Sequence, residues 1–270
     1  MTKNNQPLKL NKSAARTIDL LLLCASSDKY LTLNNICEMM QLPKSSTFEL
    51  LQTLVYKGII EVKDIDKKTY GLSLLAFEIG SAVITNLGVA DAARPFIQEL
   101  NRQTGSTVFL GVEDKGKIVY IDKAENHSTM KPTAKLGSRR YLHTTGLGKA
   151  LLHAYHDQKI IQLLGDEPYP SKTPLSHTNQ TDVLQDAKKT RERGYAIDNR
   201  EDNLDMYCIS SAIYNHENEP IASFSVASLY SGMTEDKEKL IAKLVKETAL
   251  QISRKLGFAG NKLYQQNDCM

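Results

Sequence analysis

The pattern of apolar and polar positions in residues 31–72 predicts two short helices followed by a β-hairpin. Thr32 is a good N-cap for the first helix. The apolar side chains after it share one helical face: Leu33, Ile36, Met39 and Met40. Gln41-Leu42-Pro43 then ends this helix, because proline lacks a backbone N–H and restrains the residue before it.

A second helix is predicted from Lys44 to about Lys57, with Gly58 in the left-handed position that often ends a helix. Its inward positions are apolar or small: Thr47, Leu50, Leu51, Leu54 and Val55. Its outward face carries Lys44, Ser45, Ser46, Phe48, Glu49 and Gln52. Serine and glutamine can read base edges, glutamate can accept from a cytosine amine, and phenylalanine can pack on a thymine methyl.

Residues 59–62 and 69–72 are strand-like, and they flank the polar turn 63–68. This arrangement predicts a wing in which Lys67 and Lys68 meet phosphate. Turn, polar helix face and wing follow one another in the order of a winged helix-turn-helix, so we expect this part to bind duplex DNA. The alternative is a structural three-helix module that contacts no nucleic acid.

The flanking segments predict a supporting helix and a linker. Ser13 can cap a helix whose apolar stripe is widened by Leu20 and Leu23. The stripe itself comprises Ala14, Ala15, Ile18, Leu21 and Leu22. Residues 74–86 are apolar and helical, with Leu75 and Ile79 on one side, until residues 87–89 interrupt them. We therefore expect a DNA-binding domain over residues 1–72, a linker helix over 73–88 and a second domain over 89–260.

The second half reads as antiparallel strands flanked by helices, which favours an α+β sensor domain over a parallel doubly wound sheet. Four helices are predicted. The first is capped by Asp91 and runs to about Thr104, and the second begins at Thr144 or Thr145 and covers residues 148–155. The other two cover residues 181–193 and 234–256. Strands are predicted at residues 107–112, 118–122, 195–200, 209–214 and 221–228. A further extended piece is predicted at about residues 130–136.

Charge and cysteine content add modest constraints. The 270-residue chain has a net charge of +3, and its first 72 residues hold ten Lys/Arg against seven Asp/Glu, which is also +3. The basic excess therefore lies in the predicted DNA-binding part. The four cysteines are dispersed without zinc spacing, which suits a reducing cytoplasm, and no run is long enough to span a membrane.

Three stretches of the second half are candidates for one pocket: residues 136–149, 193–208 and 223–228. The first is glycine-rich before a helix start, where free backbone N–H groups can bind an anion such as a carboxylate, although its glycines can equally serve only a tight turn. In the third, strand alternation places Ser223, Ser225 and Ala227 on one face, and the serines there are either ligand contacts or satisfied core hydroxyls.

The sequence contains no complete set of catalytic residues. Cys208 lacks an evident adjacent base, so inert packing is a better interpretation than a nucleophile. His153 and His156 lie three residues apart without a carboxylate partner on that face, and we expect a solvated pair. His143 occupies the first glycine position of a P-loop pattern, which excludes that motif. We expect no metal and no cofactor.

The order of motifs resembles that of the IclR family of bacterial transcription regulators over residues 10–256. In the first half the resemblance rests on Leu42-Pro43-Lys44-Ser45-Ser46-Thr47 and on residues 50–54. In the second half it rests on Gly137-Ser138-Arg139, Leu142-His143-Thr144, Gly148-Lys149-Ala150, Arg193-Gly194-Tyr195-Ala196 and Cys208-Ile209-Ser210.

The resemblance implies a GAF-like effector domain, a helical linker, and homodimers or dimers of dimers on a palindromic operator. Effectors in the family are commonly small organic or aromatic acids, and repression is the more frequent outcome. Carried over by position, the effector site would comprise Gly146, Leu147, Asp198, Cys208 and Ser225, with Arg140 in a wall. The family usually has an apolar residue at position 140, so an arginine there favours a carboxylate or phosphate ligand. Glu49 stands where many members carry arginine.

Two other functions remain open at this stage. A GAF-type thiol enzyme would use Cys208 as its reactive residue. An assembly module tethered to DNA would have an empty sensor domain.

Overall fold

The computed structural model describes residues 10–125 and 132–264. The chain divides into two compact units, residues 1–86 and 87–270, and each is described by itself. Among the described helices, none combines the length and the apolar character that crossing a membrane requires.

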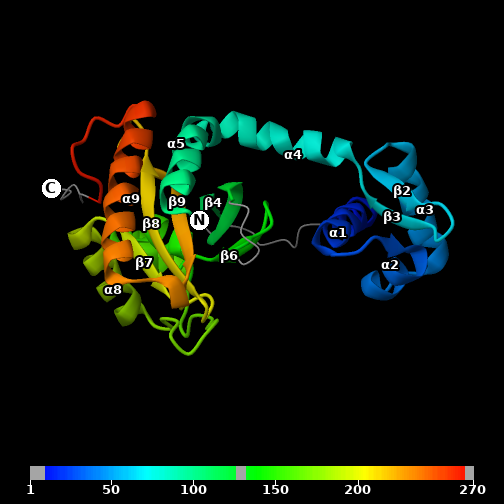
Figure 1. The fold of residues 1–270 in the computed structure, drawn as a ribbon. Helices are drawn as coiled ribbons and strands as arrows, with labels where there is room; N and C mark the ends of the chain where they lie inside the picture. Colours follow the sequence, from blue (N-terminus) through cyan, green and yellow to red (C-terminus); the bar gives the residue numbers. More distant parts are fainter. Residues whose placement is uncertain (1–9, 126–131, 265–270) are drawn as a thin grey trace, which may run out of the picture. The chain divides into compact units, whose positions relative to one another are not determined.

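The first unit is a helix-turn-helix with a small antiparallel sheet of order β1-β3-β2 (Figure 1). Its elements are α1 (Lys12–Ser26), β1 (Leu31–Thr32), α2 (Leu33–Met40), α3 (Lys44–Tyr56), β2 (Ile60–Asp64), β3 (Thr69–Leu72) and α4 (Leu74–Leu87). The helices and strands expected over residues 31–72 are therefore present, so the polar turn between β2 and β3 forms a wing.

Local chemistry explains where these helices begin and end. The Thr32 side chain accepts from the backbone N–H of Asn35, whose own side chain accepts from the N–H of Thr32, which completes a capping box on α2. Gln41 ends α2 in the left-handed conformation, with φ 53°. Gly58 follows α3 with φ 77°, a conformation that glycine adopts without steric cost.

A core of seven buried side chains holds this unit together: Leu20, Leu31, Ile36, Leu51, Leu54, Ile60 and Tyr70. The predicted stripe of α1 is wrong in part, because Leu20 is fully buried whereas Ile18 and Leu22 are 57% and 61% exposed. Met39 also points outward, being 59% exposed, so it does not share the inner face of α2. The N-cap of α1 is Asn11 and not Ser13.

The second unit contains one antiparallel sheet of six strands in the order β6-β5-β4-β9-β8-β7. Its strands are β4 (Thr107–Asp114), β5 (Lys117–Ala124), β6 (Arg139–Tyr141), β7 (Ala196–Asn199), β8 (Met206–Tyr214) and β9 (Pro220–Leu229). Its helices are α5 (Val89–Thr104), α6 (Gly146–Leu152), α7 (Asp157–Leu164), α8 (Gln180–Arg193), a short 3₁₀ turn η1 (Tyr230–Gly232) and α9 (Glu235–Lys255). These elements confirm the expected α+β class.

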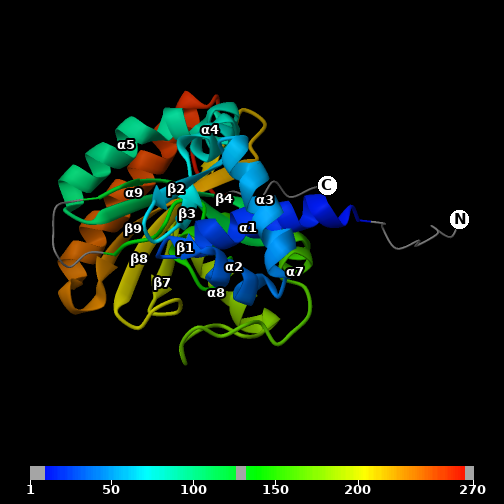
Figure 2. The same cartoon turned by 90° about the vertical axis from the view of Figure 1, so that its right-hand side faces the viewer.

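Helices cover the two faces of this sheet differently. The long helices α5 and α9 lie side by side on one face (Figures 1 and 2). Helix α6, which contacts α8, packs on the other face, against β8 and β9. The core on the α6 side includes Ile118, Leu142, Leu147, Leu151, Ile160 and Val183. The start of α6 thus lies directly against strands β8 and β9, which places its glycines at the sheet surface.

Three details of the second half differ from expectation. Residues 132–136 are not a strand, and the strand that pairs with β5 is β6; residues 130 and 131 lie outside the described residues. Helix α7 was not predicted, because its apolar stripe is only eight residues long. Helix α5 begins at Val89 with Gly88 as its N-cap, so Asp91 lies in the first turn instead of capping it.

Candidate functional site

The second unit has a pocket where the start of α6 meets the sheet. It encloses about 580 Å³, part of which is open to solvent. All six of the effector residues suggested by the sequence line it: Arg140, Gly146, Leu147, Asp198, Cys208 and Ser225. They come from β6, α6, β7, β8 and β9, so the pocket exists only once the sheet has formed.

Gly146 lets α6 approach the sheet. A Cβ at this position would lie 2.5 Å from Ser210 Oγ, 2.8 Å from Cys208 Cβ and 2.9 Å from Ser225 Oγ. These distances are too short for real carbon contacts, so a larger residue would push the helix off the strands. The glycine therefore does more than form a tight turn, since it sets the depth of the pocket.

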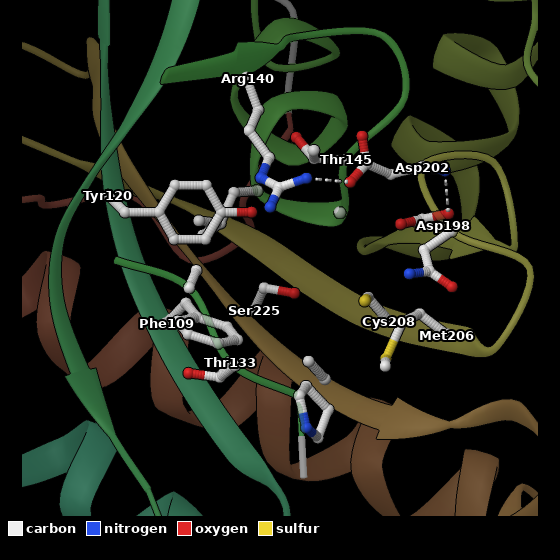
Figure 3. A pocket seen from close by; sticks show the side chains of 16 residues that line it. Phe109, Tyr120, Thr133, Arg140, Thr145, Asp198, Asp202, Met206, Cys208 and Ser225 are labelled. Atoms are coloured by element: carbon white, nitrogen blue, oxygen red, sulfur yellow. Dashed lines mark hydrogen bonds and ion pairs between the residues drawn. The ribbon is translucent and has the colours of Figure 1, made fainter. Parts of the chain in front are cut away.

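Sequence reasoning missed much of the apolar wall and one acidic residue. Phe109 and Tyr120 lie on neighbouring strands with their ring centroids 5.4 Å apart in an edge-to-face arrangement (Figure 3). Five further lining residues lie within the three candidate stretches but were not among the expected effector residues: Thr145, Asp202, Asn203, Met206 and Ala227. The run 199–203 reads as an ordinary polar turn, so no local pattern separates Asp202 from its neighbours.

Asp198 is the most deeply buried acid of the pocket, at 2% exposed. Its Oδ1 accepts the backbone N–H of Glu201 at 2.8 Å and that of Asp202 at 3.4 Å. Burial, with repulsion from Glu201, raises the pKa of this carboxyl to about 7. Asp198 can therefore donate or accept a hydrogen bond near neutral pH.

Cys208 lies beside Asp198 and is likewise buried. Burial, and then the nearby carboxylate of Asp198, raises the pKa of the Cys208 thiol well above its ordinary value. The residue is thus a neutral thiol in the pocket wall. Ser210 Oγ donates to Ser225 Oγ at 2.8 Å, and Ser223 Oγ donates to the Leu147 carbonyl oxygen at 2.8 Å.

Arg140 projects into the pocket toward Asp202 (Figure 3). Its Nη1 donates to Asp202 Oδ2 at 3.0 Å, and Thr144 Oγ1 donates to Asp202 Oδ1 at 3.0 Å. The Arg140 side chain is 39% exposed, whereas that of Asp202 is only 12% exposed. The guanidinium of Arg140 is therefore already paired with a largely buried carboxylate.

Behind the pocket, Lys149 of α6 is 1% exposed and holds two acids. Its Nζ lies 2.7 Å from Asp186 Oδ2 and 2.5 Å from Glu201 Oε1. His153 is buried nearby, with Nδ1 2.9 Å from Thr190 Oγ1, and burial lowers its pKa to about 3. The expectation of a solvated histidine pair is thus wrong, because α6 turns His153 into the core.

Potential metal ligands come together at one place in the part of the chain that the structure describes. The donor atoms of His177, Asp186 and Glu201 all lie within 4.8 Å of one another. The Lys149 ammonium group already forms ion pairs with both of these carboxylates. The absence of a metal site stays a prediction.

The predicted DNA-contacting residues of α3 are on the surface of the first unit. Lys44, Ser45, Phe48, Glu49 and Gln52 are exposed, and Ser46 is half-buried. The side chains on the opposite face, Thr47, Leu51 and Leu54, are buried in the core. The buried face therefore holds α3 against the core of the first unit, and the polar side chains at its N-terminal end stay accessible.

The wing is a closed turn with its two lysines outward. The backbone N–H of Lys67 donates to Asp64 Oδ1 at 3.0 Å, which ties the turn to β2. Lys67 and Lys68 are exposed, and Lys68 takes a left-handed conformation with φ 49°. Lys67 Nζ lies 3.8 Å from Asp64 Oδ2, a surface pair that water screens strongly.

Comparison with known proteins agrees with this geometry. Residues 13–64 match the model of the IclR helix-turn-helix domain, and residues 81–254 match that of the bacterial transcriptional regulator IclR C-terminal domain. The chain is 31% identical over 242 residues to the HTH-type transcriptional repressor AllR of Escherichia coli K12, covering 90% of this chain and 89% of AllR. It is 29% identical to the HTH-type transcriptional regulator XynR of the same organism, covering 92% and 98%.

Solved structures give the same result. The IclR protein of Thermotoga maritima superposes with a TM-score of 0.79 at 28% identity, covering 92% of this chain and 99% of that one. An IclR homologue of Microbacterium hydrocarbonoxydans, solved in complex with 4-hydroxybenzoate, has the same fold, with a TM-score of 0.76 at 18% identity, covering 90% and 98%. The chain belongs to the IclR family of transcriptional regulators.

Proposed function

We propose that this regulator is a repressor whose operator affinity is set by a small organic acid bound in the pocket of the second unit. The observation that carries the proposal is the pairing of two sites in one chain. One is the exposed polar end of α3, and the other is a pocket whose wall includes a guanidinium. The repressor AllR is similar over most of the chain, and a structural relative holds the aromatic acid 4-hydroxybenzoate.

The DNA-contacting residues in this proposal are those of α3 and the wing. Ser45, Ser46 and Gln52 read base edges, while Lys44, Lys67 and Lys68 contact phosphate. Phe48 packs on a thymine methyl group, and Glu49 accepts from a cytosine amine. A palindromic operator follows if two copies bind together, since each copy then reads one half-site.

The working form in this proposal is a homodimer, or a dimer of dimers. Large apolar side chains on two helices of the first unit remain exposed in the single chain. On α1 these are Ile18 and Leu22, and on α4 they are Leu74, Phe77 and Ile79, each more than half exposed. Leu74 and Phe77 lie three residues apart, so they share one side of α4, and in this proposal a second copy of the chain covers that side.

Footprinting upstream of the protein's own gene, after a thermal-shift screen of metabolic acids, tests the proposal. We expect one acid both to stabilise the protein and to change the operator affinity by about 5- to 150-fold, the usual range of allosteric coupling. Equal protection of random duplexes, with no response to any acid that binds, would contradict it.

The two other functions make different predictions. A thiol enzyme would lose turnover in Cys208→Ser, but the neutral buried thiol gives no support to this chemistry, and the relatives are transcriptional regulators. An assembly module with an empty sensor would show no thermal shift with any metabolite.

A further inference from the structure

The Arg140–Asp202 pair gives the pocket an unusual charge arrangement. Among the lining residues that the structure describes there is one cationic side chain, Arg140, against two acids, Asp198 and Asp202. An incoming carboxylate therefore meets a guanidinium that is already occupied, in a wall that carries at least as much negative as positive charge. Any anion that binds Arg140 has to do so in competition with Asp202.

The release of Asp202 is costly because of where it lies. Its side chain is 12% exposed, so water cannot replace the lost guanidinium fully. Thr144 continues to donate to Oδ1, but Oδ2 has Arg140 as its donor at 3.0 Å. A ligand that takes Arg140 without offering a donor leaves Oδ2 poorly satisfied.

We infer that the Arg140–Asp202 pair is the element that selects the ligand: it admits a hydroxy acid whose carboxylate replaces Asp202 on Arg140 and whose hydroxyl donates to the carboxylate that is released. Carboxylic acids of the same size without a hydroxyl bind less well, because they take Arg140 from Asp202 and offer no donor to the Asp202 carboxylate. This inference rests on the proposed binding of an acid and names the class of acid.

The backbone around Asp202 supports an exchange at this position. Asp202 follows Glu201, whose carbonyl oxygen accepts from Thr173 and Ser176 and whose side chain binds Lys149. Asp198 holds the backbone N–H groups of both Glu201 and Asp202. The turn is thus fixed from the side away from the pocket, so exchange of partners requires movement of the Asp202 side chain and not of the chain behind it.

The test compares acetate with glycolate, two acids that are ionised at neutral pH and differ by one hydroxyl. Dissociation constants are measured by ligand-detected NMR titration of the full-length protein. In the wild type we expect glycolate to bind about tenfold more tightly than acetate, the contribution of one hydrogen bond to a charged group. In Asp202→Ala we expect acetate to bind about tenfold more tightly than in the wild type, and the preference for glycolate to fall to about twofold or less.

Asp205→Ala is the matched control, because Asp205 is an exposed acid of the same segment and does not line the pocket. It removes the same charge and should leave both dissociation constants as in the wild type. Arg140→Gln is a second variant whose result does not depend on whether Asp202→Ala folds. It should weaken the binding of both acetate and glycolate about tenfold.

Three outcomes would overturn the inference: unchanged or weaker acetate binding in Asp202→Ala, an undiminished glycolate preference in that variant, or no response to either acid in any variant. The readout does not involve DNA. If the acids bind as expected but do not change the operator footprint, the proposed regulation is refuted and the inference about ligand selection is not.

Discussion

At the scale of single residues, the pocket is governed by burial of polar groups. Asp198, Cys208 and Asp202 are ordinary residue types, and their properties here follow from being enclosed between α6 and the sheet. Enclosure raises the pKa of the Asp198 carboxyl and keeps Cys208 as a thiol. Side chains that would be solvated on a surface turn thus become hydrogen-bonding groups of a binding site.

Asp198 should make the second unit lose stability as pH rises. Its pKa is about 7 in the folded protein against 3.8 ordinarily, so the folded state keeps a proton that the unfolded chain has lost. The free energy of unfolding therefore falls between about pH 4 and pH 7, by at most about 4 kcal/mol from this group. Relative to the wild type, Asp198→Asn should gain stability across this window in urea titrations, and a difference that does not change with pH would contradict the assignment.

Gly146→Ala should destabilise the second unit and reduce the pocket. The new Cβ would fall 2.5 Å from Ser210 Oγ, so α6 or the strands must move, at a cost of about 1–3 kcal/mol. Gly232→Ala is the control, since Gly232 lies in the same unit, has no left-handed φ, and a Cβ there meets nothing within 4 Å. Chemical denaturation measures both; equal stability of the two variants would show that α6 does not need the close approach.

At the scale of elements, the first unit shows two kinds of helix face. The inner faces of α1, α2 and α3 build one small core, whereas the outer faces of α3 and α4 carry side chains that this core does not use. On α3 these are mainly polar and suited to DNA. On α4 they are apolar and suited to another protein surface.

Substitutions on α3 and the wing should separate recognition from affinity. Gln52→Ala should weaken binding to the operator by about 1–3 kcal/mol and relax the preference for one base pair, because a base contact is lost. Lys68→Ala should weaken binding to all duplexes alike. It should also reduce the slope of log affinity against log salt concentration by about one, since one phosphate contact is lost. Titrations by fluorescence anisotropy at several salt concentrations distinguish them, and identical behaviour of the two variants would count against the assigned roles.

A charge on the exposed apolar face of α4 should dissociate the dimer. Phe77 is 68% exposed in the single chain, so Phe77→Glu places a carboxylate in the proposed interface without disturbing the core. Sedimentation should show a dimer for the wild type and a shift toward monomer for the variant. Ser13→Glu, at an exposed polar position of α1, should stay dimeric. A wild-type monomer would refute the proposed assembly.

At the scale of the whole molecule, regulation requires that binding at the pocket and binding at the DNA-contacting surface be thermodynamically coupled. An acid can change DNA affinity only by the difference in its own affinity for the DNA-binding and non-binding states. No direct contact between acid and DNA is required for this. The coupling has to be the same in both directions.

Operator DNA should therefore change the affinity of the effector by the same factor by which the effector changes operator affinity. For a repressor released by its ligand, saturating operator would weaken acid binding by about 5- to 150-fold. Calorimetric titration of the acid into free protein and into the protein–operator complex measures this factor. Unequal factors in the two directions would show that the effector and the operator are not linked through one equilibrium.

The sequence alone determined the features that depend on neighbours along the chain. Thr32, Pro43 and Gly58 delimit the helices of the helix-turn-helix through capping, loss of an N–H and a left-handed conformation, all of which act within a few residues. Periodicity predicted most strands and helices of the second unit for the same reason. Gly146 and Cys208 were expected in the pocket because of the resemblance to the IclR family, which matches short motifs along the chain.

Only the tertiary structure decided which distant residues meet. The sheet order β6-β5-β4-β9-β8-β7 brings Phe109, Tyr120 and Ser225 around one cavity, although they are far apart in sequence. The pairing of Arg140 with Asp202, 62 residues away, depends on the same packing. Sequence patterns indicate which face of a helix or strand is apolar, but hydrogen bonds and ion pairs between elements depend on where folding places their ends. For this reason Asp198 was expected from the sequence, whereas the place of Asp202 in the pocket became visible only in three dimensions.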